Sequence, residues 1–373
     1  MPAKRLFRVC AGLLLYAQAG YGAALALVAR LRPARPGPSA WPQPPTVSLI
    51  VAAYREQEVI GPKVTDALAQ HYPRERFEVV VAVDGADAGT ARGARAAGAD
   101  AVLELPRAGK VRAQDAAVAR SRADVVAFSD ANATWSPDAL AELVAPLADP
   151  AVGYVCGQVS FTGGEGNQEG LYWRYEMALR GLESRLASVT GGNGAIYAVR
   201  RAAYVEVDPV MGHDLSLPFT LVKRGWRAVY EPRARATERM VPTIEGEWAR
   251  KRRMMSHAWP IVVRGGLLSP RGYGPLYAWM ILSHRVLRYL TPFLHLALLG
   301  ASLRLAPRSR PHAAALAGQG ALLAAAAAGA RRRSRPLLLA RYYVLTTAAI
   351  AAGAWDWLRH GTEPGWEQAG GTR

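Results

Sequence analysis

The sequence predicts an α/β fold in its central part, with apolar helices at both ends. Near-continuous apolar, β-branched runs occur at residues 46–53 (TVSLIVAA), 77–83 and 123–128, each followed by a polar tip and then a helical pattern. Such runs are typical of strands that are buried on both faces of a parallel sheet. Long apolar segments near both ends of the 373-residue chain predict helices in a membrane.

Polar and acidic residues stand where the three predicted strands end. Tyr54 and Glu56 follow the first strand, Asp84 the second, and Asp130 with Asn132 the third. Ligands of open parallel sheets bind beyond the carboxyl ends of the strands, so these side chains are expected to converge on one crevice. An Asp at such a position can also simply cap the next helix. The phosphate-binding motifs G-x-G-x-x-G after the first strand and G-x-x-x-x-G-K-[ST] are absent, which argues against a dinucleotide oxidoreductase and a P-loop protein.

The chain is rich in Arg and carries a formal charge of +17. An excess of this size favours anionic partners such as phosphorylated substrates or anionic membrane lipid. Nucleic acid is not expected as a partner, because the basic residues lie beside apolar segments and are not interleaved with aromatic residues. Cys10 and Cys156 are too few and too far apart for a disulfide framework or a thiolate metal site.

Residues 9–29 form an apolar run that is interrupted only by Gln18. It is long enough for a transmembrane helix, which needs about 20 residues. A secretory signal peptide with a basic leader at residues 4–8 is the competing interpretation. The Pro-rich residues 32–45 are expected to form a stiff linker to the next domain.

The C-terminal part contains apolar runs at residues 289–305, 312–330 and 336–358, each about long enough to span a membrane. The basic loop at residues 331–335 (RRRSR) is expected in the cytoplasm by the positive-inside rule. Counting back two crossings places residues 46–288 there as well. The sequence therefore predicts a multi-pass protein of the cell membrane with a cytoplasmic central domain. A buried soluble helix is the alternative for the Ala-rich end of the second run.

Further motifs follow the opening segment VSLIVAAYREQEVI in a fixed order. They are RAGKVRAQDAAV with Gly109 and Lys110, SDANA at residues 129–133, GGNGAIYAVRR at 191–201 and GHDL at 212–215. With these motifs, residues 46–266 resemble the family-2 glycosyltransferases of GT-A fold, which include cellulose and hyaluronan synthases. The sequence departs from this family at Arg55 and Asp115, where Asn is usual.

The resemblance implies a nucleotide-sugar donor, with a UDP-sugar favoured. In such enzymes the turn after the first strand and the next strand-end Asp hold the base and ribose, which here are Tyr54, Glu56 and Asp84. Lys110 belongs to the Gly-Lys element that precedes the central helix, and it is expected on the donor side.

The SDANA segment resembles the D-x-D motif that touches the ribose and the diphosphate-bound metal. It implies that Asp130 and Asn132 bind Mg²⁺ or Mn²⁺, although an Asn carbonyl adds no charge. Arg250 and Arg253 stand where membrane synthases carry Q-x-x-R-W, so both are expected to bind the donor. Met254 replaces the Trp of that motif, which helps to shape the acceptor channel in processive synthases, so processive and single transfer both remain open.

The segment at residues 212–215 resembles the family's Glu-Asp element, which implies that Asp214 is the catalytic base. Inverting sugar transfer needs a carboxylate that takes the proton of the acceptor hydroxyl, and cations that stabilise the departing diphosphate. Gly192, Asn193 and His213 are expected on the acceptor side. The expected activity is an inverting glycosyl transfer to a saccharide or a lipid-linked acceptor.

Two alternatives remain open at this point. A polyprenyl-phosphate glycosyltransferase fits the basic segment 244–288 equally well, because such a helix suits a phosphate-bearing lipid. A non-catalytic membrane scaffold that binds nucleotide sugars would tolerate the loss of Asp214. The expected domains are an anchor with its linker (1–45), a GT-A domain (46–243), basic interfacial helices (244–288) and a C-terminal membrane region (289–373).

Overall fold

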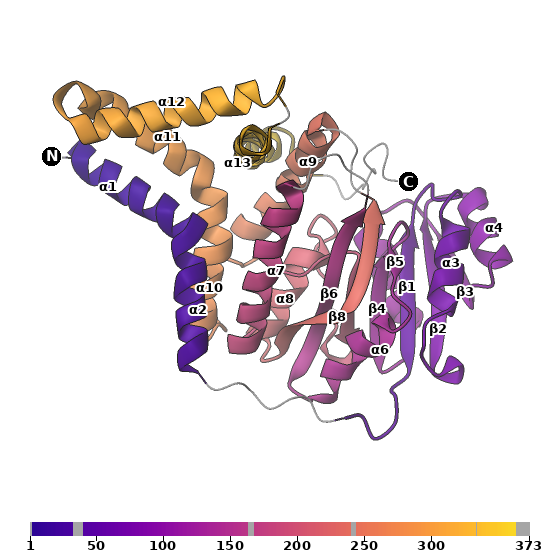
Figure 1. Cartoon of the computed structure of the whole chain (residues 1–373). Helices are drawn as coiled ribbons and strands as arrows, with labels where there is room; N and C mark the ends of the chain where they lie inside the picture. Colours follow the sequence, from indigo (N-terminus) through magenta and orange to yellow (C-terminus); the bar gives the residue numbers. More distant parts are fainter. Residues whose placement is uncertain (1, 33–39, 163–167, 240–243, 333, 363–373) are drawn as a thin grey trace.

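The structure is a computed structural model, and it describes residues 2–32, 40–162, 168–239, 244–332 and 334–362. An α/β domain forms one side of the molecule, and helices from both ends of the chain gather on the other (Figure 1). Residues 33–39 of the expected linker and residue 333 of the basic loop lie outside the described residues.

The α/β domain is built on one mixed sheet of eight strands in the order β3-β2-β1-β4-β7-β6-β8-β5. The strands β3, β2, β1 and β4 run parallel, and β7 is antiparallel to both β4 and β6. At the far end, β8 is parallel to β6 and antiparallel to β5. The strands are β1 (Val47–Ala53), β2 (Phe77–Asp84), β3 (Ala101–Leu105), β4 (Val125–Asp130), β5 (Thr134–Trp135), β6 (Val152–Thr162), β7 (Ile196–Arg200) and β8 (Arg227–Arg239).

The three strands expected from the sequence are β1, β2 and β4, which lie side by side in the sheet. Side chains of β1 alternate between two buried faces. Leu49 packs among residues that include Leu140 and Leu143, whereas Ile50 packs on the other face among residues that include Ala113 and Ala117. Burial on both faces explains why these strands read as continuous apolar runs.

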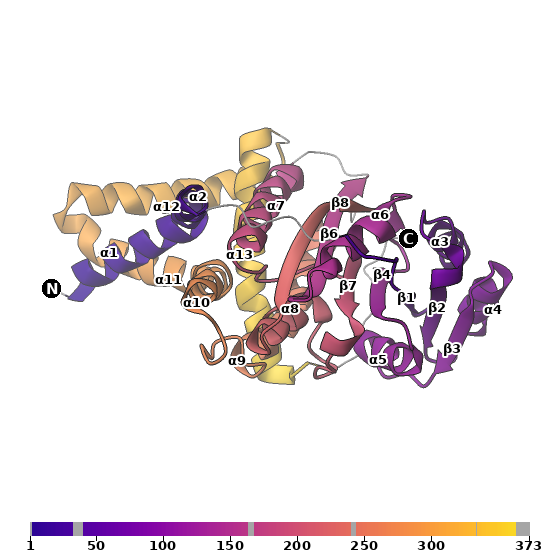
Figure 2. The same ribbon diagram turned by 90° about the horizontal axis from the view of Figure 1, so that it is seen from below.

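Helices cover both faces of this sheet (Figures 1 and 2). The α/β prediction is therefore confirmed. The helices of the domain are α3 (Ile60–Leu68), α4 (Ala88–Ala96), α5 (Lys110–Arg120), α6 (Ala139–Val144), α7 (Gln168–Leu186) and α8 (His213–Lys223).

Two long helices outside this domain each contain a π-helical segment. The N-terminal one consists of α1 (Pro2–Leu15), η1 (Tyr16–Gly20) and α2 (Tyr21–Leu31). The second consists of α10 (Pro275–Met280), η5 (Ile281–Val286) and α11 (Leu287–Leu305). Such segments are identifiable causes of helix bends. The domain boundary expected at residue 289 thus lies inside a continuous helix.

Three helices in the described parts of the chain are long and apolar enough to cross a membrane: Pro2–Leu31, Pro275–Arg308 and Arg335–His360. They contain the expected spans at residues 9–29, 289–305 and 336–358. Large apolar side chains on these helices are exposed, and they include Leu27, Leu296 and Leu358. Exposed apolar surface of this kind indicates contact with lipid or a partner.

The span expected at residues 312–330 is an exception. It forms α12 (Arg310–Ala328), which does not belong to the three described helices with the length and hydropathy of a span. Polar residues within it, Arg310, His312 and Gln319, lower its mean hydropathy. The span expected there stays a prediction. The alternative of a buried helix is wrong, because Ala326 is the only buried residue of α12. The cytoplasmic placement of residues 46–288 was counted with residues 312–330 as one crossing, so this placement also stays a prediction.

The last helix, α13 (Arg335–His360), runs crosswise to α12 and packs against α9 (Ile244–Val263) (Figures 1 and 2). Trp259 Nε1 of α9 donates a hydrogen bond to Ile350 O of α13 at 2.9 Å. Arg252 forms a bidentate ion pair with Asp356 at 2.6 Å for each hydrogen bond. The basic helix expected from residue 244 onward is therefore present, and one side of it is covered by α13.

The central position of β1 predicts a large effect of shortening Leu49, whose side chain is fully buried. Leu49→Ala is expected to lower the free energy of unfolding by about 2–5 kcal/mol, since it removes buried methyl groups and leaves a cavity. Denaturant titration of the detergent-solubilised protein measures this. Leu268→Ala, at a position that is 51% exposed, is the matched control. Equal stability of the two variants would contradict the assignment of β1 to the core.

Candidate functional site

The carboxyl ends of β1, β2 and β4 form one edge of the sheet. Asp84 and Asp130 are the last residues of β2 and β4, and Tyr54 directly follows β1. In the register of the sheet, Ala52 lies opposite Asp130, and Ala53 lies opposite the residue before Asp84. The structure thus brings these three residues to one place, as the sequence predicted.

A hollow of about 260 Å³ opens at this edge. The Arg107 guanidinium stacks on the Tyr54 ring, with Cζ 3.4 Å from the ring centroid. Arg55 has a φ of 56° and is the one non-glycine residue with positive φ in the described part of the chain. Asn adopts this conformation more readily than Arg, which agrees with the Asn that is usual at this position of the family. The hollow is lined by Tyr54, Arg55, Gly85, Ala86, Asp87 and Arg107.

Asp84 organises the turn that leads into α5. Its side chain is buried and forms an ion pair with Arg107. Its Oδ1 also accepts a hydrogen bond from the Ala108 N–H at 2.7 Å, and its Oδ2 accepts one from the Gly109 N–H at 3.0 Å. Asp84 therefore sets the path of the chain to Lys110, the first residue of α5.

Glu56 belongs to the turn between β1 and α3, and it is buried. Its backbone N–H donates to Thr90 Oγ1 at 2.9 Å, and its carbonyl accepts from the N–H groups of Val59 and Ile60. Glu56 thus fixes the turn that carries Tyr54.

Lys110 and Asp130 form an ion pair across the edge of the sheet. Burial would lower the pKa of Lys110, but the charges of Asp130 and Asp214 outweigh burial and raise it. The ammonium group lies 3.2 Å from the place where a Cβ on Gly194 would stand. A permanently charged lysine at this point suits a phosphate group.

Glu238, near the end of β8, is a second carboxylate at this end of the site. Burial and the charge of Asp130 raise the pKa of Glu238 to about 7. Asn132 follows Asp130 by two residues, and it can offer an amide oxygen. These oxygens fit the preference of Mg²⁺ or Mn²⁺. No cluster of three His, Cys, Asp or Glu side chains occurs in the described ranges, so a diphosphate would have to complete the coordination of an ion.

Asp214 lies in the first turn of α8, where the helix dipole stabilises a carboxylate. Its backbone carbonyl accepts a hydrogen bond from the Gly192 N–H at 2.6 Å. Its Oδ1 would be only 2.7 Å from a Cβ on Gly212, so that position favours glycine. The charge of Asp214 also raises the pKa of Lys110, so the carboxylate and the ammonium group belong to the same site.

The 190–194 loop is held by its own side chains and by close packing. A Cβ on Gly192 would stand 1.9 Å from Tyr154 Oη, so no larger residue fits there. Asn193 is buried, with Nδ2 donating to Gly157 O at 2.7 Å and Oδ1 accepting from the Ile196 N–H at 2.9 Å. The loop therefore presents backbone at Gly192, and the Asn193 amide anchors it.

His213 is buried behind this site. Its Nδ1 lies 2.9 Å from Tyr197 Oη, and its ring packs edge-on against Phe128, Tyr197 and Tyr204. Burial and the charge of Lys110 lower the pKa of His213 to about 3, so the ring is neutral at pH 7. His213 is 4% exposed and thus does not line the surface of the site.

Arg250 and Arg253 lie about one turn apart on α9 (Ile244–Val263). Arg250 binds Glu247 through two hydrogen bonds of 2.7 Å, and its charge also acts on Glu238. The charge of Arg253, together with burial, lowers the pKa of His257.

Sequence reasoning missed three polar residues of this site. Arg107 stands three residues before Lys110, and its place next to the Gly-Lys element could have identified it. Glu238 lies near the end of β8, a strand that the sequence indicated only at its beginning. Arg180 is spaced on α7 like an ordinary surface residue, yet it is buried and its Nη2 donates to Gly192 O at 2.9 Å.

Comparison with known proteins identifies the family. Residues 44–256 match the family described as glycosyltransferase like family 2. An N-acetylglucosaminyltransferase of Rhizobium leguminosarum bv. viciae is 26% identical over 235 residues, which cover 56% of this chain and 54% of that protein. One from Rhizobium leguminosarum bv. trifolii is 36% identical over 124 residues, which cover 31% of this chain and 67% of that protein. The chain spans about half the length of the first of these relatives.

A solved structure extends the likeness beyond the α/β domain. The mannosyltransferase PcManGT from Pyrobaculum calidifontis, in complex with GDP-Man and Mn²⁺, matches with a TM-score of 0.77 and 24% identity. The match covers 96% of this chain and 99% of that one, so it includes the flanking helices. The GT-A fold expected from the sequence is therefore confirmed. Since the family match covers more than half of the chain, the protein belongs to glycosyltransferase family 2.

Proposed function

We propose that this protein is an inverting glycosyltransferase at the cytoplasmic face of a membrane. It moves a sugar from a nucleotide-diphosphate donor to a saccharide or lipid-linked acceptor. The observation that carries the proposal is that Asp214 is joined to the 190–194 loop by the hydrogen bond from Gly192 and that its charge acts on Lys110, which pairs with Asp130. This arrangement offers a carboxylate for an acceptor hydroxyl beside a site that suits a diphosphate.

The donor would lie along the carboxyl ends of β1, β2 and β4. The stacked Tyr54 and Arg107 offer a flat face beside the hollow for the base, while Asp84 and Glu56 hold the turns that shape it. We favour a UDP-sugar, as the resemblance to cellulose and hyaluronan synthases implies. The relatives named N-acetylglucosaminyltransferase and the mannosyltransferase solved with GDP-Man support a nucleotide-sugar donor in general.

A divalent cation, Mg²⁺ or Mn²⁺, would be held by Asp130 and Asn132, with Glu238 close by. The ion supplies positive charge that stabilises the diphosphate as it leaves. Arg250 and Arg253 add guanidinium groups from α9, and their planar donors suit phosphate oxygens. The Mn²⁺ in the solved mannosyltransferase supports this part of the proposal.

Transfer is a single displacement in which Asp214 acts as the base. The acceptor oxygen attacks the anomeric carbon, and its proton passes to the Asp214 carboxylate. A new bond forms between the acceptor oxygen and the anomeric carbon, while the bond from this carbon to the diphosphate oxygen breaks. The electron pair of that bond leaves with the diphosphate, next to Lys110. Attack opposite the leaving group inverts the configuration at the anomeric carbon.

Two other functions lead to different expectations. A polyprenyl-phosphate glycosyltransferase would use a phosphate oxygen as nucleophile, so it would not need Asp214 as a base. A non-catalytic scaffold would bind a nucleotide sugar without releasing nucleoside diphosphate. Incubation with a panel of nucleotide sugars, followed by identification of the labelled product, separates these functions.

Asp214→Asn is expected to reduce the transfer rate by about 10²- to 10⁴-fold, because it removes the general base. Donor affinity should change little, since the base acts on the acceptor. Asp208→Asn, an exposed position six residues earlier, is the matched control. Transfer rate and donor affinity are measured on purified, folded protein. Near wild-type transfer by Asp214→Asn would disprove this mechanism.

Arg253→Ala is expected to weaken donor binding and also to slow transfer, since the diphosphate is charged in both the ground state and the transition state. Arg252→Ala is the control, because Arg252 pairs with Asp356 on the side of α9 that faces α13. Calorimetry with the donor and initial-rate measurements give the two quantities. If both variants behave alike, Arg253 does not contact the donor.

Asp130→Ala is expected to weaken donor binding and to remove most of its enhancement by Mn²⁺. Asp84→Ala should also weaken binding, with a loss of stability of about 1–3 kcal/mol, because the N–H groups of Ala108 and the buried Gly109 lose their acceptor. Calorimetry with and without Mn²⁺ tests both, and Asp138→Ala, whose side chain is 71% exposed, is the control. Unchanged donor affinity in both variants would place the donor elsewhere.

Cysteine labelling in intact cells tests the cytoplasmic placement. Glu75→Cys on the α/β domain and Ser334→Cys in the basic loop are both exposed positions, while Cys10 and Cys156 are buried and give little background. Both introduced thiols should resist a membrane-impermeant reagent until the cells are opened. Labelling of Glu75→Cys from outside would disprove the cytoplasmic placement. Labelling of Ser334→Cys alone would show that the basic loop lies across the membrane from the domain.

A further inference from the structure

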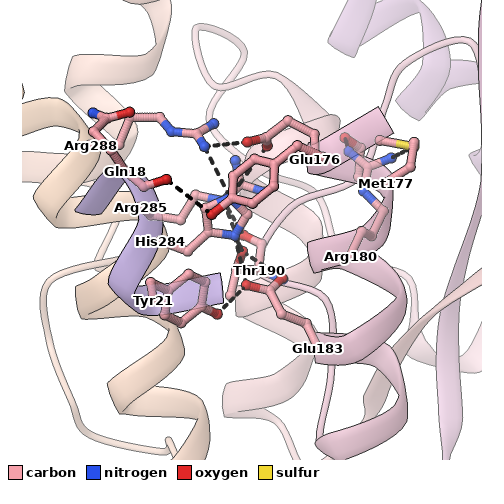
Figure 3. Close-up of polar contacts among 12 residues, drawn as sticks. Gln18, Tyr21, Glu176, Met177, Arg180, Glu183, Thr190, His284, Arg285 and Arg288 are labelled. Carbon is pink, nitrogen blue, oxygen red and sulfur yellow. Dashed lines mark hydrogen bonds and ion pairs between the residues drawn. The ribbon is translucent and has the colours of Figure 1, made fainter. Parts of the chain in front are cut away.

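A buried cluster of charged side chains joins the α/β domain to the long apolar helices (Figure 3). Glu176, Arg180 and Glu183 recur at helical spacing on one face of α7. Opposite them stand residues of the second long helix and of the 190–194 loop, which contact this face as Figure 3 shows. These residues are His284, Arg285, Arg288 and Thr190.

The two carboxylates of the cluster are occupied by partners within it. Glu176 accepts from Arg288 and lies 3.3 Å from His284 Nε2. Glu183 accepts from the Thr190 N–H at 3.1 Å and lies 2.6 Å from His284 Nδ1. Burial would raise the pKa of both carboxyls, but Arg288 and His284 beside Glu176, and His284 and Arg285 beside Glu183, outweigh burial and lower it. Both glutamates are therefore ionised.

Positive charge is nevertheless in excess, because three arginines face two glutamates whatever the protonation of His284. The charge of Arg285 acts on Glu183, but the two side chains form no ion pair. Arg285 Nε donates instead to Thr190 O and Oγ1 at 3.2 and 3.0 Å. Arg180 is 7% exposed, and no carboxylate pairs with it in the described part of the chain. A buried charge without a counter-ion is costly, so an anion at this point would stabilise it.

The two arginines flank the same short stretch of backbone. Arg180 Nη2 donates to Gly192 O at 2.9 Å, and Arg285 Nη2 would be 2.6 Å from a Cβ on Gly191. A guanidinium group has five N–H donors in a plane, and these contacts use only part of them. The remaining donors suit the oxygens of a phosphate group.

This stretch of backbone leads directly to the reaction site. Gly192 N–H donates to the backbone carbonyl of Asp214, and the position of a Cβ on Gly194 is 3.4 Å from Asp130 Oδ2. A group bound by Arg180 and Arg285 is thus a few residues of chain away from both the base and the donor site.

The helix that carries Arg285 also carries exposed apolar side chains. Leu282, Leu290 and Phe293 lie on the same continuous helix as Arg285 and are 60%, 41% and 43% exposed. Exposed apolar side chains next to cationic groups suit a molecule with a hydrocarbon chain and an anionic head.

We propose that Arg180 and Arg285 bind a phosphate group of the acceptor, and that the acceptor is a lipid-linked saccharide whose chain follows the apolar surface of α11. This rests on the proposed function, since a hydroxyl of the saccharide still gives its proton to Asp214. The phosphate is not changed in the reaction, and its role is to position the reacting hydroxyl.

Binding of two simple probes tests the site without any transfer. Farnesyl phosphate and farnesol differ only in the phosphate, and both are added in detergent micelles. Saturating UDP and Mn²⁺ are present, so that the donor site is filled. Wild-type protein should bind farnesyl phosphate about ten-fold or more tightly than farnesol, because of charge-assisted hydrogen bonds to the phosphate.

Arg180→Gln and Arg285→Gln should each reduce this preference severalfold while farnesol binding stays the same. Arg285→Lys keeps the charge and should retain part of the preference, which covers the case that a Gln variant fails to fold. Arg304→Gln, on the same helix at an exposed position, is the matched control and should behave like wild type. An unchanged preference in the Gln variants would overturn the proposal. An equal loss of affinity for both probes would also overturn it, because that result is expected if the two arginines only stabilise the 190–194 loop.

Competition identifies the source of the phosphate. If glycerol 3-phosphate displaces farnesyl phosphate at similar concentration, the site takes the phosphate of a soluble acceptor, and the lipid part of the proposal is wrong. Failure of the proposed function appears separately, as unchanged transfer by Asp214→Asn with an intact preference for farnesyl phosphate.

Discussion

The structure depends on one buried carboxylate, that of Glu183. Its Oε1 accepts from Tyr21 Oη of α2 and lies 2.6 Å from His284 of the second long helix. Its Oε2 accepts from both the N–H and the hydroxyl of Thr190 at 3.1 and 3.0 Å. A buried ionised carboxylate is tolerated only when its lone pairs accept hydrogen bonds. The stability of α7 at this point therefore depends on α2, the second long helix and the 190–194 loop, which supply the partners of Glu183. The cluster is a constraint on the whole fold.

The 190–194 loop connects the buried cluster around Glu183 to the reaction site. At one end Thr190 is bound to a carboxylate that both apolar helices share, and at the other Gly194 packs against Lys110 and Asp130. Between them Gly192 is hydrogen-bonded to Asp214. Glycines allow this close approach of backbone to side chains, because a Cβ would collide at more than one position. The geometry of the reaction site is therefore set jointly by the sheet and by the helices outside it.

Local pattern was enough to predict β1, β2 and β4 and the residues that follow them, because strands buried on both faces have an unmistakable composition. It was not enough for β3, whose five residues are mostly only partly buried, or for β6, whose apolar run is interrupted by Gly153 and Gly157. The cluster around Glu183 was missed for another reason. Ionisable residues at helical spacing look like a solvated face, and only contacts across 101 and 162 positions reveal that they are buried. The helix expected at residues 312–330 is present as α12, but it does not belong to the three candidate spans, so its crossing of a membrane stays a prediction.

The junction between α7 and the two long helices limits which segments of such a protein can be removed or exchanged. A simple tether can be exchanged for any other hydrophobic segment, because the domain it carries folds without it. Here, removal of the N-terminal helix would take Tyr21 from Glu183, and removal of the second long helix would take His284 and Arg285 as well. A water-soluble fragment of residues 46–263 would thus expose an apolar face with uncompensated carboxylates. The α/β domain and the apolar helices therefore depend on each other for stability. This dependence limits domain shuffling and the design of shortened forms.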